Sequence, residues 1–302
     1  MRVLISGGTG MIGRALTSSL LGDGHSVWVL TRHPSSGRVP AGAQAVGWDG
    51  RSSDGWGELV NRIDAVVNLV GERLSEWPWT PARRARFWNS RVDGGRAIAE
   101  AIRRASHRPQ VLVQASGVNY YGLRGTEPLS EADLPGADEL SRLCLAWEAS
   151  TQPVEGLGVR RAIARTAVVL SAAEGILPIM MLPLRLYAGG PLAGGHQGLP
   201  WIHLRDEVNA LRFLLGSEAG QGPFNLCAPQ PVSNGEFLRT LARILRRPYW
   251  LPVPGIALRA VLGGMSALVL AGAFPQPGRL LRLGFRFQFP NLEEALREVL
   301  AR

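Results

Sequence analysis

The 302-residue chain contains no lysine, and all 33 of its basic residues are arginines. Any active site that depends on a lysine side chain is therefore excluded. Cysteine is almost as scarce, because only Cys144 and Cys227 occur, far apart and without the spacing of metal ligands. We expect no metal site. No basic-then-apolar signal precedes the first apolar residues, and we expect the protein in a reducing cytoplasm.

Acidic residues are outnumbered, which gives the chain a formal net charge of +9. Such a balance raises the question of a nucleic-acid partner. The arginines, however, include pairs scattered between acids, such as Arg83-Arg84 and Arg246-Arg247, and do not form one basic stripe. We therefore interpret them mostly as solvated faces and do not expect a nucleic-acid partner. An arginine-driven nucleic-acid binder is the weaker alternative.

Apolar runs long enough to cross a membrane are also missing. One stretch, residues 256–274, is apolar apart from Arg259, but its uninterrupted part, residues 260–274, is shorter than the roughly 20 residues of a spanning helix. We expect no transmembrane segment and interpret this stretch as a buried or interface helix. Assembly as a homodimer is left open.

The chain does have an apolar content of 46%, enough for an extensive core, and 37 glycines. The apolar run Val3-Leu4-Ile5 leads into a glycine-rich turn at residues 7–13, and apolar residues at helical spacing follow at residues 14–21. A strand, a glycine turn and a helix in this order place the unpaired N–H groups of the helix start where a dinucleotide diphosphate binds. We predict that this turn binds such a cofactor through Gly7, Gly10, Met11, Ile12 and Gly13.

The residues after the second predicted strand, residues 26–31, indicate which dinucleotide is bound. An NAD site places an acidic residue about 20 residues after the glycines, where it holds the ribose 2′-hydroxyl. Here Thr31 and Arg32 occupy that position. A guanidinium pairs with a 2′-phosphate, which an acid would repel, so we predict NADP, with Arg32 as the principal contact and Thr31 and Arg38 as helpers. The alternative is that Arg32 is one more solvated arginine.

Strand and helix patterns continue along the chain, with strands predicted at residues 43–48, 64–70, 110–116, 159–170 and 224–227 and helices at residues 81–106, 236–246 and 292–300. We predict an α/β fold, a Rossmann-type doubly wound parallel sheet with right-handed crossovers. The carboxyl ends of its strands line one ligand crevice. The further cofactor-binding residues predicted there are Asn68, Leu69, Gly71, Glu72 and Ser116. Glu72 could instead cap the next segment.

The later part of the chain is rich in loop signals. Residues 178–200 contain many proline, glycine and apolar residues, and we predict a long loop at the substrate-side rim, with His196, Gln197 and Arg185 as polar groups. We divide the chain into an NADP-binding Rossmann domain, residues 1–170 and about 201–228, and a smaller substrate-side C-terminal lobe, residues about 171–200 and 229–302.

Several motifs in order resemble the extended short-chain dehydrogenase/reductase superfamily, and more narrowly its atypical epimerase family branch. The resemblance covers essentially the whole chain and implies a Rossmann domain that binds NADP, a relation to sugar-nucleotide epimerases, and a small extra C-terminal module. Its motifs lie at residues 7–13, 68–72, 116–122, 165–170 and 201–203 with Asp206, and those of the module at residues 252–254, 283–287 and 290–296.

The same resemblance implies a catalytic Ser or Thr, a Tyr, and a Lys four residues after the Tyr, which lowers the pKa of the Tyr and holds the nicotinamide ribose. In this chain Leu140 replaces the tyrosine and Cys144 the lysine, and Gly117 falls at the position of the serine. Chemistry at a carbonyl or hydroxyl still needs an acid or base within hydrogen-bond reach of the reacting oxygen. The remaining candidates are Tyr121, Tyr120, Ser116 and His203.

These candidates have structural alternatives. Tyr121 with Gly122 resembles a structural Tyr-Gly pair of related enzymes, and Tyr120 could simply be packed. His203, followed by Asp206, could anchor a loop to a helix start. Cys144 could be a nucleophile, but an inert buried thiol is the better interpretation.

We predict an NADP-dependent oxidoreductase or epimerase-like enzyme that acts on an unknown polar small molecule through non-standard acid/base residues. Hydride transfer belongs to the nicotinamide, so the protein need only position it and stabilise charge on oxygen. The competing hypothesis is a catalytically inactive NADP-binding sensor or scaffold protein, which the missing lysine supports.

Overall fold

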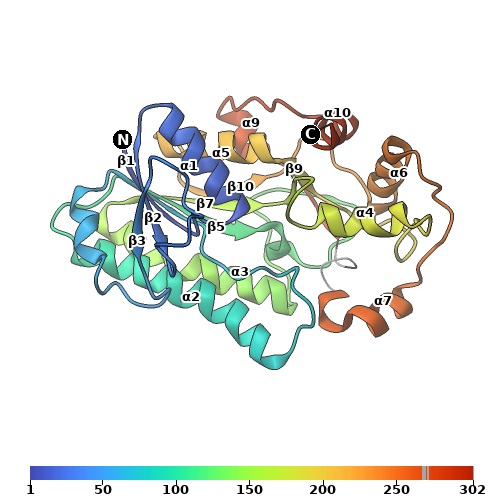
Figure 1. Cartoon of the computed structure of the whole chain (residues 1–302), viewed down its shortest axis with the longest axis horizontal. Coiled ribbons are helices and arrows are strands. Elements are labelled where there is room, and N and C mark those ends of the chain that lie inside the picture. The colour runs from blue at the N-terminus through green and yellow to red at the C-terminus, as the bar shows by residue number, and fades with distance from the viewer. Residues whose placement is uncertain (267–269, 271, 302) are drawn as a thin grey trace.

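A seven-stranded parallel sheet forms the centre of the computed structural model, which describes residues 1–266, 270 and 272–301 (Figure 1). Its neighbouring strands all run parallel. Across the sheet the order is β10 (Gly222–Leu226), β7 (Arg160–Thr166), β5 (Val111–Gly117), β4 (Ala65–Asn68), β1 (Arg2–Ser6), β2 (Ser26–Thr31) and β3 (Gln44–Gly47). This is the order of a doubly wound Rossmann sheet with one further strand, so the predicted fold class is confirmed.

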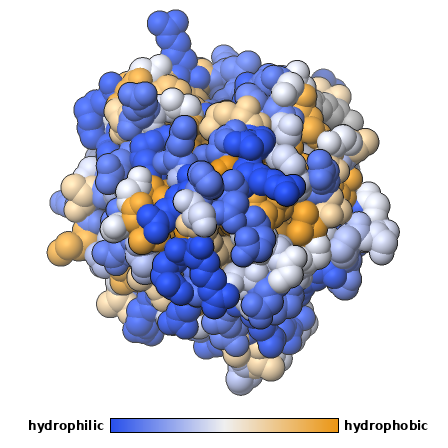
Figure 2. Space-filling model, turned by 90° about the vertical axis from the view of Figure 1, so that its left-hand side faces the viewer, coloured by the Kyte–Doolittle hydropathy of each residue, from blue (hydrophilic) through white to orange (hydrophobic). Residues whose placement is uncertain are grey.

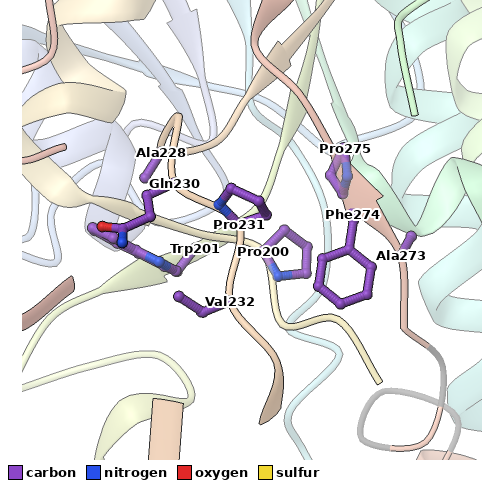
Figure 3. Close-up of a pocket in the computed structure, with 9 residues that line it drawn as sticks. All are labelled: Pro200, Trp201, Ala228, Gln230, Pro231, Val232, Ala273, Phe274 and Pro275. Atoms are coloured by element: carbon purple, nitrogen blue, oxygen red, sulfur yellow. The ribbon is translucent and has the colours of Figure 1, made fainter. Parts of the chain in front are cut away.

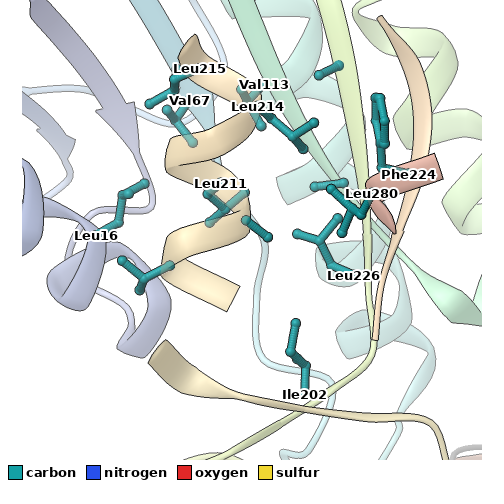
Figure 4. Packing of buried hydrophobic residues seen from close by; sticks show 14 of the residues in the cluster. Leu16, Val67, Val113, Ile202, Leu211, Leu214, Leu215, Phe224, Leu226 and Leu280 are labelled. Atoms are coloured by element: carbon teal, nitrogen blue, oxygen red, sulfur yellow. The ribbon is translucent and has the colours of Figure 1, made fainter. Parts of the chain in front are cut away.

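Helices cover both faces of the sheet (Figure 1). One face carries α1 (Met11–Gly22) and α5 (Leu204–Gly216), which pack against each other, and the other carries α2 (Pro81–Arg104) and α3 (Glu139–Ser150). Side chains of a strand point alternately to the two faces, so Ile5 joins the α1 and α5 core and Leu4 the α2 core. Figure 4 shows Leu16 of α1 and Leu211 of α5 in the first of these cores, close to Val67.

The chain leaves two neighbouring central strands toward opposite faces. After β1 it forms α1 on one face, and after β4 it forms α2 on the other (Figure 1). Such a switch point opens a crevice at the carboxyl ends of the strands, where ligands of doubly wound sheets bind. The glycine turn at residues 7–10 lies at this point.

A smaller group of elements continues the chain beyond the main sheet. The predicted strand at residues 159–170 is in fact two strands, β7 and β8 (Val168–Leu170), because the backbone changes partners at Ala167. The Ala167 amide donates to Leu226, whereas the Val168 amide donates to Pro200. β8 then pairs in parallel with β9 (Trp201–His203), and this pair packs with α4 (Leu177–Arg185), α6 (Asn234–Leu245) and α10 (Leu292–Leu300).

The long loop predicted at residues 178–200 is wrong in its first part, which α4 occupies. Pro178 lies in the first turn of the helix, where a residue needs no N–H partner. Leu177, Met181 and Leu184 are spaced to share one helix face and are buried in a cluster with α6. This packing outweighs the low helix propensity of Pro178 and of Pro183 inside the helix.

The predicted helix within residues 256–274 is only partly present. The chain forms α7 (Gly255–Leu262) and a 3-10 turn, η4 (Gly263–Ser266), and residues 267–269 and 271 lie outside the described residues. Ile256 is 78% exposed, so the start of α7 is not buried within the chain, and the interface alternative stays a prediction. In the part of the chain that the structure describes, no helix is both long and apolar enough to cross a bilayer.

Short elements connect the longer helices and strands. They are η1 (Gly57–Arg62), η2 (Val118–Tyr121), β6 (Pro128–Leu129), η3 (Gln152–Leu157), β11 (Phe274–Pro275) and α9 (Gly278–Arg282).

The end of the molecule that carries β2 and β3 has a mostly hydrophilic surface with small hydrophobic patches (Figure 2).

Candidate functional site

The glycine turn after β1 is too tight for any larger residue. Gly7 has a φ of +69°, and a Cβ atom there would lie 2.5 Å from the carbonyl oxygen of Leu69. A Cβ atom on Gly13 would collide with the carbonyl oxygen of Gly7. The two glycines therefore let the start of α1 approach the ends of β1 and β4 closely, which leaves the backbone itself as the surface of the crevice.

The start of α1 has no side-chain cap. Gly10 occupies the N-cap position in an extended conformation, and its side chain is a hydrogen atom. The N–H groups of the first turn, at Met11, Ile12 and Gly13, have no intrahelical acceptor in any α-helix. N–H groups of this kind, together with the positive end of a helix dipole, suit an anion such as a diphosphate, and its binding at Met11, Ile12 and Gly13 stays a prediction.

An ion-pair cluster covers the flank of this helix start. Arg14 donates to the carbonyl oxygen of Thr9 at 2.5 Å and pairs with Glu174, which lies in the loop after β8. Glu174 also accepts a hydrogen bond from Arg73, at 3.2 Å. The loop after β8 thus lies against the start of α1.

The end of β2 presents a cation to solvent. Thr31 is buried, and its Oγ1 atom accepts from the amide of His33 at 3.2 Å. Arg32 is exposed, and among the described residues its guanidinium has no hydrogen-bond or ion-pair partner. The side chain is therefore available for a ligand anion beyond β2.

Asn68 at the end of β4 is fully buried, and its amide is already engaged. Ser6 Oγ donates to Asn68 Oδ1 at 2.5 Å, and Asn68 Nδ2 donates to Gln114 Oε1 at 2.8 Å. These bonds tie the ends of β1, β4 and β5 together. The residue holds the edge of the crevice in place, and its contact with a cofactor stays a prediction.

The residues after Asn68 are held by backbone and helix contacts. The amide of Leu69 donates to the Ser6 carbonyl at 3.1 Å. Glu72 accepts from Arg86 Nε of α2 at 3.1 Å, and its own amide donates to Ser90 Oγ at 3.0 Å. Glu72 therefore binds side chains within α2 and does not cap the start of that helix.

Ser116 at the end of β5 belongs to a buried charged network. Its hydroxyl donates to Glu148 Oε1 of α3 at 2.7 Å. The Glu148 carboxylate also accepts from Arg165 of β7, through Nε at 2.9 Å and Nη2 at 3.1 Å. A two-pronged pair of this kind is geometrically well defined, and it fixes α3 against β5 and β7.

Two tyrosines follow β5, and the network continues into Tyr121. Its hydroxyl donates to Asn225 Oδ1 at 2.7 Å and accepts from Arg165 at 3.2 Å, and burial raises its pKa to about 12. Tyr120 stacks under the Arg165 guanidinium, whose Cζ lies 3.4 Å from the ring centroid. The Tyr120 hydroxyl has no hydrogen-bond partner among the described residues.

His203 caps the start of α5. Its Nδ1 accepts from the Arg205 amide at 3.1 Å, and its Nε2 lies 2.9 Å from the Glu298 carboxylate of α10. Burial lowers the pKa of His203, and the nearby Glu298 opposes that effect. Both ring nitrogens are therefore engaged, Nδ1 in capping α5 and Nε2 in joining α10 to it.

A recess opens where the residues after β5 and the start of β8 face the later loops. It is a shallow recess that is open to solvent, with a cavity volume of about 50 Å³. Leu140 of α3 lines it together with two polar residues, Asn119 and Asp138. Asp138 Oδ1 caps α3 by accepting from the Ser141 amide at 2.9 Å, and the other carboxylate oxygen packs against Gly122. A smaller recess shares Pro200 and Ala273 with it and contains Trp201, Gln230 and Phe274 (Figure 3).

Comparison with known proteins places this arrangement in a family. The model of the NAD dependent epimerase/dehydratase family matches residues 3–227, well over half of the chain. The chain belongs to this family. The model of a domain of unknown function, DUF1731, matches residues 253–299, so both the predicted family and its C-terminal module are confirmed.

Full-length relatives of this epimerase-family chain are known. The epimerase family protein SDR39U1 of Bos taurus is 38% identical over 307 residues, which cover 100% of both chains. The epimerase family protein YfhF of Bacillus subtilis is 35% identical over 303 residues, 100% of this chain and 98% of that protein. The crystal structure of human SDR39U1 with NADPH matches with a TM-score of 0.88 and 32% identity, and covers 100% of both chains.

Two residues of α3 differ from the catalytic residues that the family resemblance implies. Leu140 and Cys144 stand where the resemblance implies a tyrosine and a lysine. Leu140 lines the recess, and Cys144 is a free, buried thiol whose pKa burial raises to about 12. This environment supports the interpretation of Cys144 as an inert thiol.

Sequence reasoning missed three polar residues near the crevice. Asn119 and Asp138 line the recess, and Arg91 of α2 lies against Gly71. Asn119 directly precedes the two tyrosines after β5, so its position next to a strand end was a usable signal, whereas Asp138 is the N-cap residue of α3 and does not follow a strand. Arg91 gives no local signal, because the approach of α2 to the ends of β4 and β5 depends on the tertiary packing.

Proposed function

We propose that this chain binds NADP(H) across the carboxyl ends of β1, β2, β4 and β5 and uses it as an oxidoreductase or epimerase-like enzyme on a polar small molecule. The observation that carries the proposal is the uncapped start of α1 at a turn where Gly7 and Gly13 admit no side chain. Arg32, free and exposed beyond β2, suits the 2′-phosphate that distinguishes NADP from NAD. The NADPH in the human relative's structure supports the same cofactor.

The residues of the chain would divide the work of binding between them. The first N–H groups of α1 would hold the diphosphate, and Arg32 would hold the 2′-phosphate with Thr31 beside it. Leu69, Gly71, Glu72 and Ser116 would border the cofactor at the ends of β4 and β5. When bound, NADP(H) supplies hydride transfer.

The recess beside α3 is the proposed substrate site. Leu140 gives it an apolar wall, the Asn119 amide can donate to a substrate oxygen, and the Asp138 carboxylate can hold a proton or accept one from a hydroxyl. Tyr121, Ser116 and His203 would each have to give up a buried hydrogen bond to react, whereas Tyr120 would not. Polar, hydroxyl-bearing substrates fit this set of groups.

The proposed site also divides the chain as the sequence suggests. Residues 1–170 and about 201–228 would bind the cofactor, and residues about 171–200 and 229–302 would form the substrate side. The recess draws on both parts, through Asn119 and Asp138 on one side and Gly198 and Gly272 on the other. A homodimer and a cytoplasmic location remain parts of the proposal.

Titration of the protein with NADPH and NADH tests the cofactor proposal. We expect wild type to prefer NADPH, and Arg32→Ala to weaken NADPH binding by about 10- to 100-fold, the equivalent of one or two charge-assisted hydrogen bonds, with no effect on NADH. Arg62→Ala removes an equal charge from the opposite ends of the strands and serves as the control. Equal, weak binding of both cofactors by wild type would contradict the proposal.

Transfer of label tests the enzymatic part. We expect stereospecific loss of deuteride from NADPH labelled at nicotinamide C4 when the protein is given mixtures of polar metabolites. Tight NADPH binding with no turnover across broad mixtures would instead favour a sensor or scaffold.

A further inference from the structure

Arg91 is a buried arginine of α2 without an acidic partner. Its side chain belongs to a residue only 8% exposed, and its Nη1 donates to the carbonyl oxygen of Phe87, one helical turn earlier, at 3.1 Å. Among the described residues, no carboxylate lies within ion-pair distance of its guanidinium, and Nε and Nη2 have no acceptor. Burial lowers the pKa of Arg91 to about 10, so it remains a cation at neutral pH.

Two other arginines are buried among the residues that the structure describes, and both form ion pairs within the protein. Arg161 pairs with Glu155 at 2.8 Å, and Arg165 pairs with Glu148 at 2.9 Å. A buried cation is costly unless it is paired and hydrogen-bonded, and Arg161 and Arg165 meet that condition within the protein. Arg91 has only the Phe87 carbonyl, the Trp147 ring and the more distant charge of Glu72 around it, and it forms no ion pair.

The surroundings of Arg91 place it at the predicted cofactor crevice. A Cβ atom on Gly71, just beyond β4, would lie 2.9 Å from Arg91 Cζ, so the guanidinium lies directly against the strand end. On its other side the guanidinium lies 4.9 Å from the ring centroid of Trp147 of α3. The charge of Arg91 also acts on Cys144, one turn earlier on α3.

Cys144 stands at the position where the resemblance implies a lysine that holds the nicotinamide ribose. The thiol cannot supply that cation, but the guanidinium beside it can, from a different helix. The next strand end is that of β5, where the Cys144 sulfur lies close to Gly117. Arg91 therefore lies between the ends of β4 and β5, on the side of the crevice away from Arg32 and β2.

We propose that Arg91 binds the phosphoribosyl oxygens of the nicotinamide half of NADP(H), and so supplies the positive charge that the missing lysine would provide. This inference rests on the proposed function, because it needs the dinucleotide to lie along the strand ends. The Arg91 guanidinium has free N–H donors for hydroxyl or phosphate oxygens, and it stays charged at all physiological pH values. Arg91 positions and binds the cofactor and takes no proton.

The test compares binding of whole NADPH with binding of a fragment that lacks the nicotinamide half, adenosine 2′,5′-bisphosphate. The variant is Arg91→Met, which keeps a long side chain and removes the charge. Arg96→Met removes an equal charge from the exposed face of the same helix and is the matched control. The thermal unfolding midpoint of each variant without ligand is measured alongside.

We expect Arg91→Met to weaken NADPH binding by about 10- to 100-fold and to leave the affinity for adenosine 2′,5′-bisphosphate within about 2-fold of wild type. Without ligand, its unfolding midpoint should equal or exceed that of wild type, because an unpaired buried cation is removed. Arg96→Met should bind both ligands as wild type does. A purely structural arginine would instead lower the midpoint and weaken both ligands together.

Unchanged NADPH binding in Arg91→Met, or equal loss for NADPH and the fragment, overturns the inference and leaves the proposed function intact. If wild type binds neither NADPH nor the fragment, both the inference about Arg91 and the proposed function are overturned. If the methionine variant does not fold, Arg91→Lys gives the same comparison. We expect it to bind NADPH more weakly than wild type by about 3- to 10-fold, since lysine lacks the planar fork, with the fragment again unaffected.

Discussion

At the scale of single residues, the tyrosine that most invites a catalytic role is held by structure. The Tyr121 hydroxyl bridges Asn225 and Arg165, and no part of the side chain is exposed. Such a pair of bonds positions the loop after β5 and leaves the oxygen little freedom to meet a substrate. The tyrosine at position 121 correctly marked a strand end beside the proposed site, but it did not indicate whether its hydroxyl reacts or holds the structure.

Replacement of Tyr121 distinguishes a structural from a catalytic role of its hydroxyl. Tyr121→Phe removes the hydroxyl and leaves Asn225 without its donor, so we expect the free energy of unfolding to fall by about 1–3 kcal/mol. NADPH affinity should not change. Urea unfolding followed by NADPH titration measures both quantities, and a stable variant with lost turnover would show that the hydroxyl reacts.

Glu207 of α5 predicts a dependence of stability on pH. It is fully buried, with one oxygen accepting from Thr166 at 2.8 Å and the other without a partner in the described structure, and burial raises its pKa from 4.5 to about 8. Because the folded state holds this proton more tightly, its contribution to stability is complete below about pH 4.5. It is lost as the pH rises to about 8.

The difference between wild type and Glu207→Gln isolates this contribution. Between pH 4.5 and about pH 8, the free energy of unfolding of wild type should fall relative to that of the variant by up to about 1.4 kcal/mol per pH unit. The difference should level off above pH 8. Denaturant unfolding at a series of pH values measures it. Parallel pH profiles for the two proteins would mean that Glu207 is ionised throughout.

At the scale of elements, the C-terminal module is fastened to the start of α5. Asp206 accepts from the amides of Gln288 and Phe289 at 2.7 and 2.9 Å, and His203 contacts Glu298 of α10. The Phe289 ring also lies 3.9 Å from the His203 ring, centroid to centroid. The motif that joins His203 and Asp206 in the sequence thus serves to hold the module against the Rossmann part.

Removal of the Asp206 carboxylate should loosen that attachment. Asp206→Ala leaves the partly buried amides of Gln288 and Phe289 without an acceptor, and we expect a loss of about 1–2 kcal/mol in the free energy of unfolding. Hydrogen exchange should accelerate in residues 286–300 and remain slow in β1, β4 and β5, which serve as the internal reference. Uniform acceleration over the whole chain would contradict a local attachment.

The elements that sequence patterns predicted well are those whose pattern is local. The buried strands β1, β2, β4 and β5 consist of short apolar runs, and the start of α1 is marked by its glycines. The exchange of partners at Ala167 and the helix α4 with its two prolines depend on contacts with segments distant in sequence. Arg91 was missed for the same reason, since only the fold brings α2 beside Gly71.

At the scale of the whole molecule, the chain has the architecture of its family without the usual catalytic pair. The switch point between β1 and β4, the uncapped α1 and the free Arg32 remain, while Leu140 and Cys144 occupy the positions of the implied tyrosine and lysine. Positive charge near the strand ends is supplied by Arg91, and polar groups at the recess by Asn119 and Asp138. The site could therefore retain cofactor binding with a different acid/base arrangement.

The central claim is that NADP(H) occupies the crevice at the start of α1 with its 2′-phosphate at Arg32. The measurement that tests it most directly is a crystal structure of the protein grown with excess NADPH. We expect density for the diphosphate at the amides of Met11, Ile12 and Gly13 and for the 2′-phosphate beside Arg32. A crevice that stays empty or filled by side chains under those conditions would contradict it.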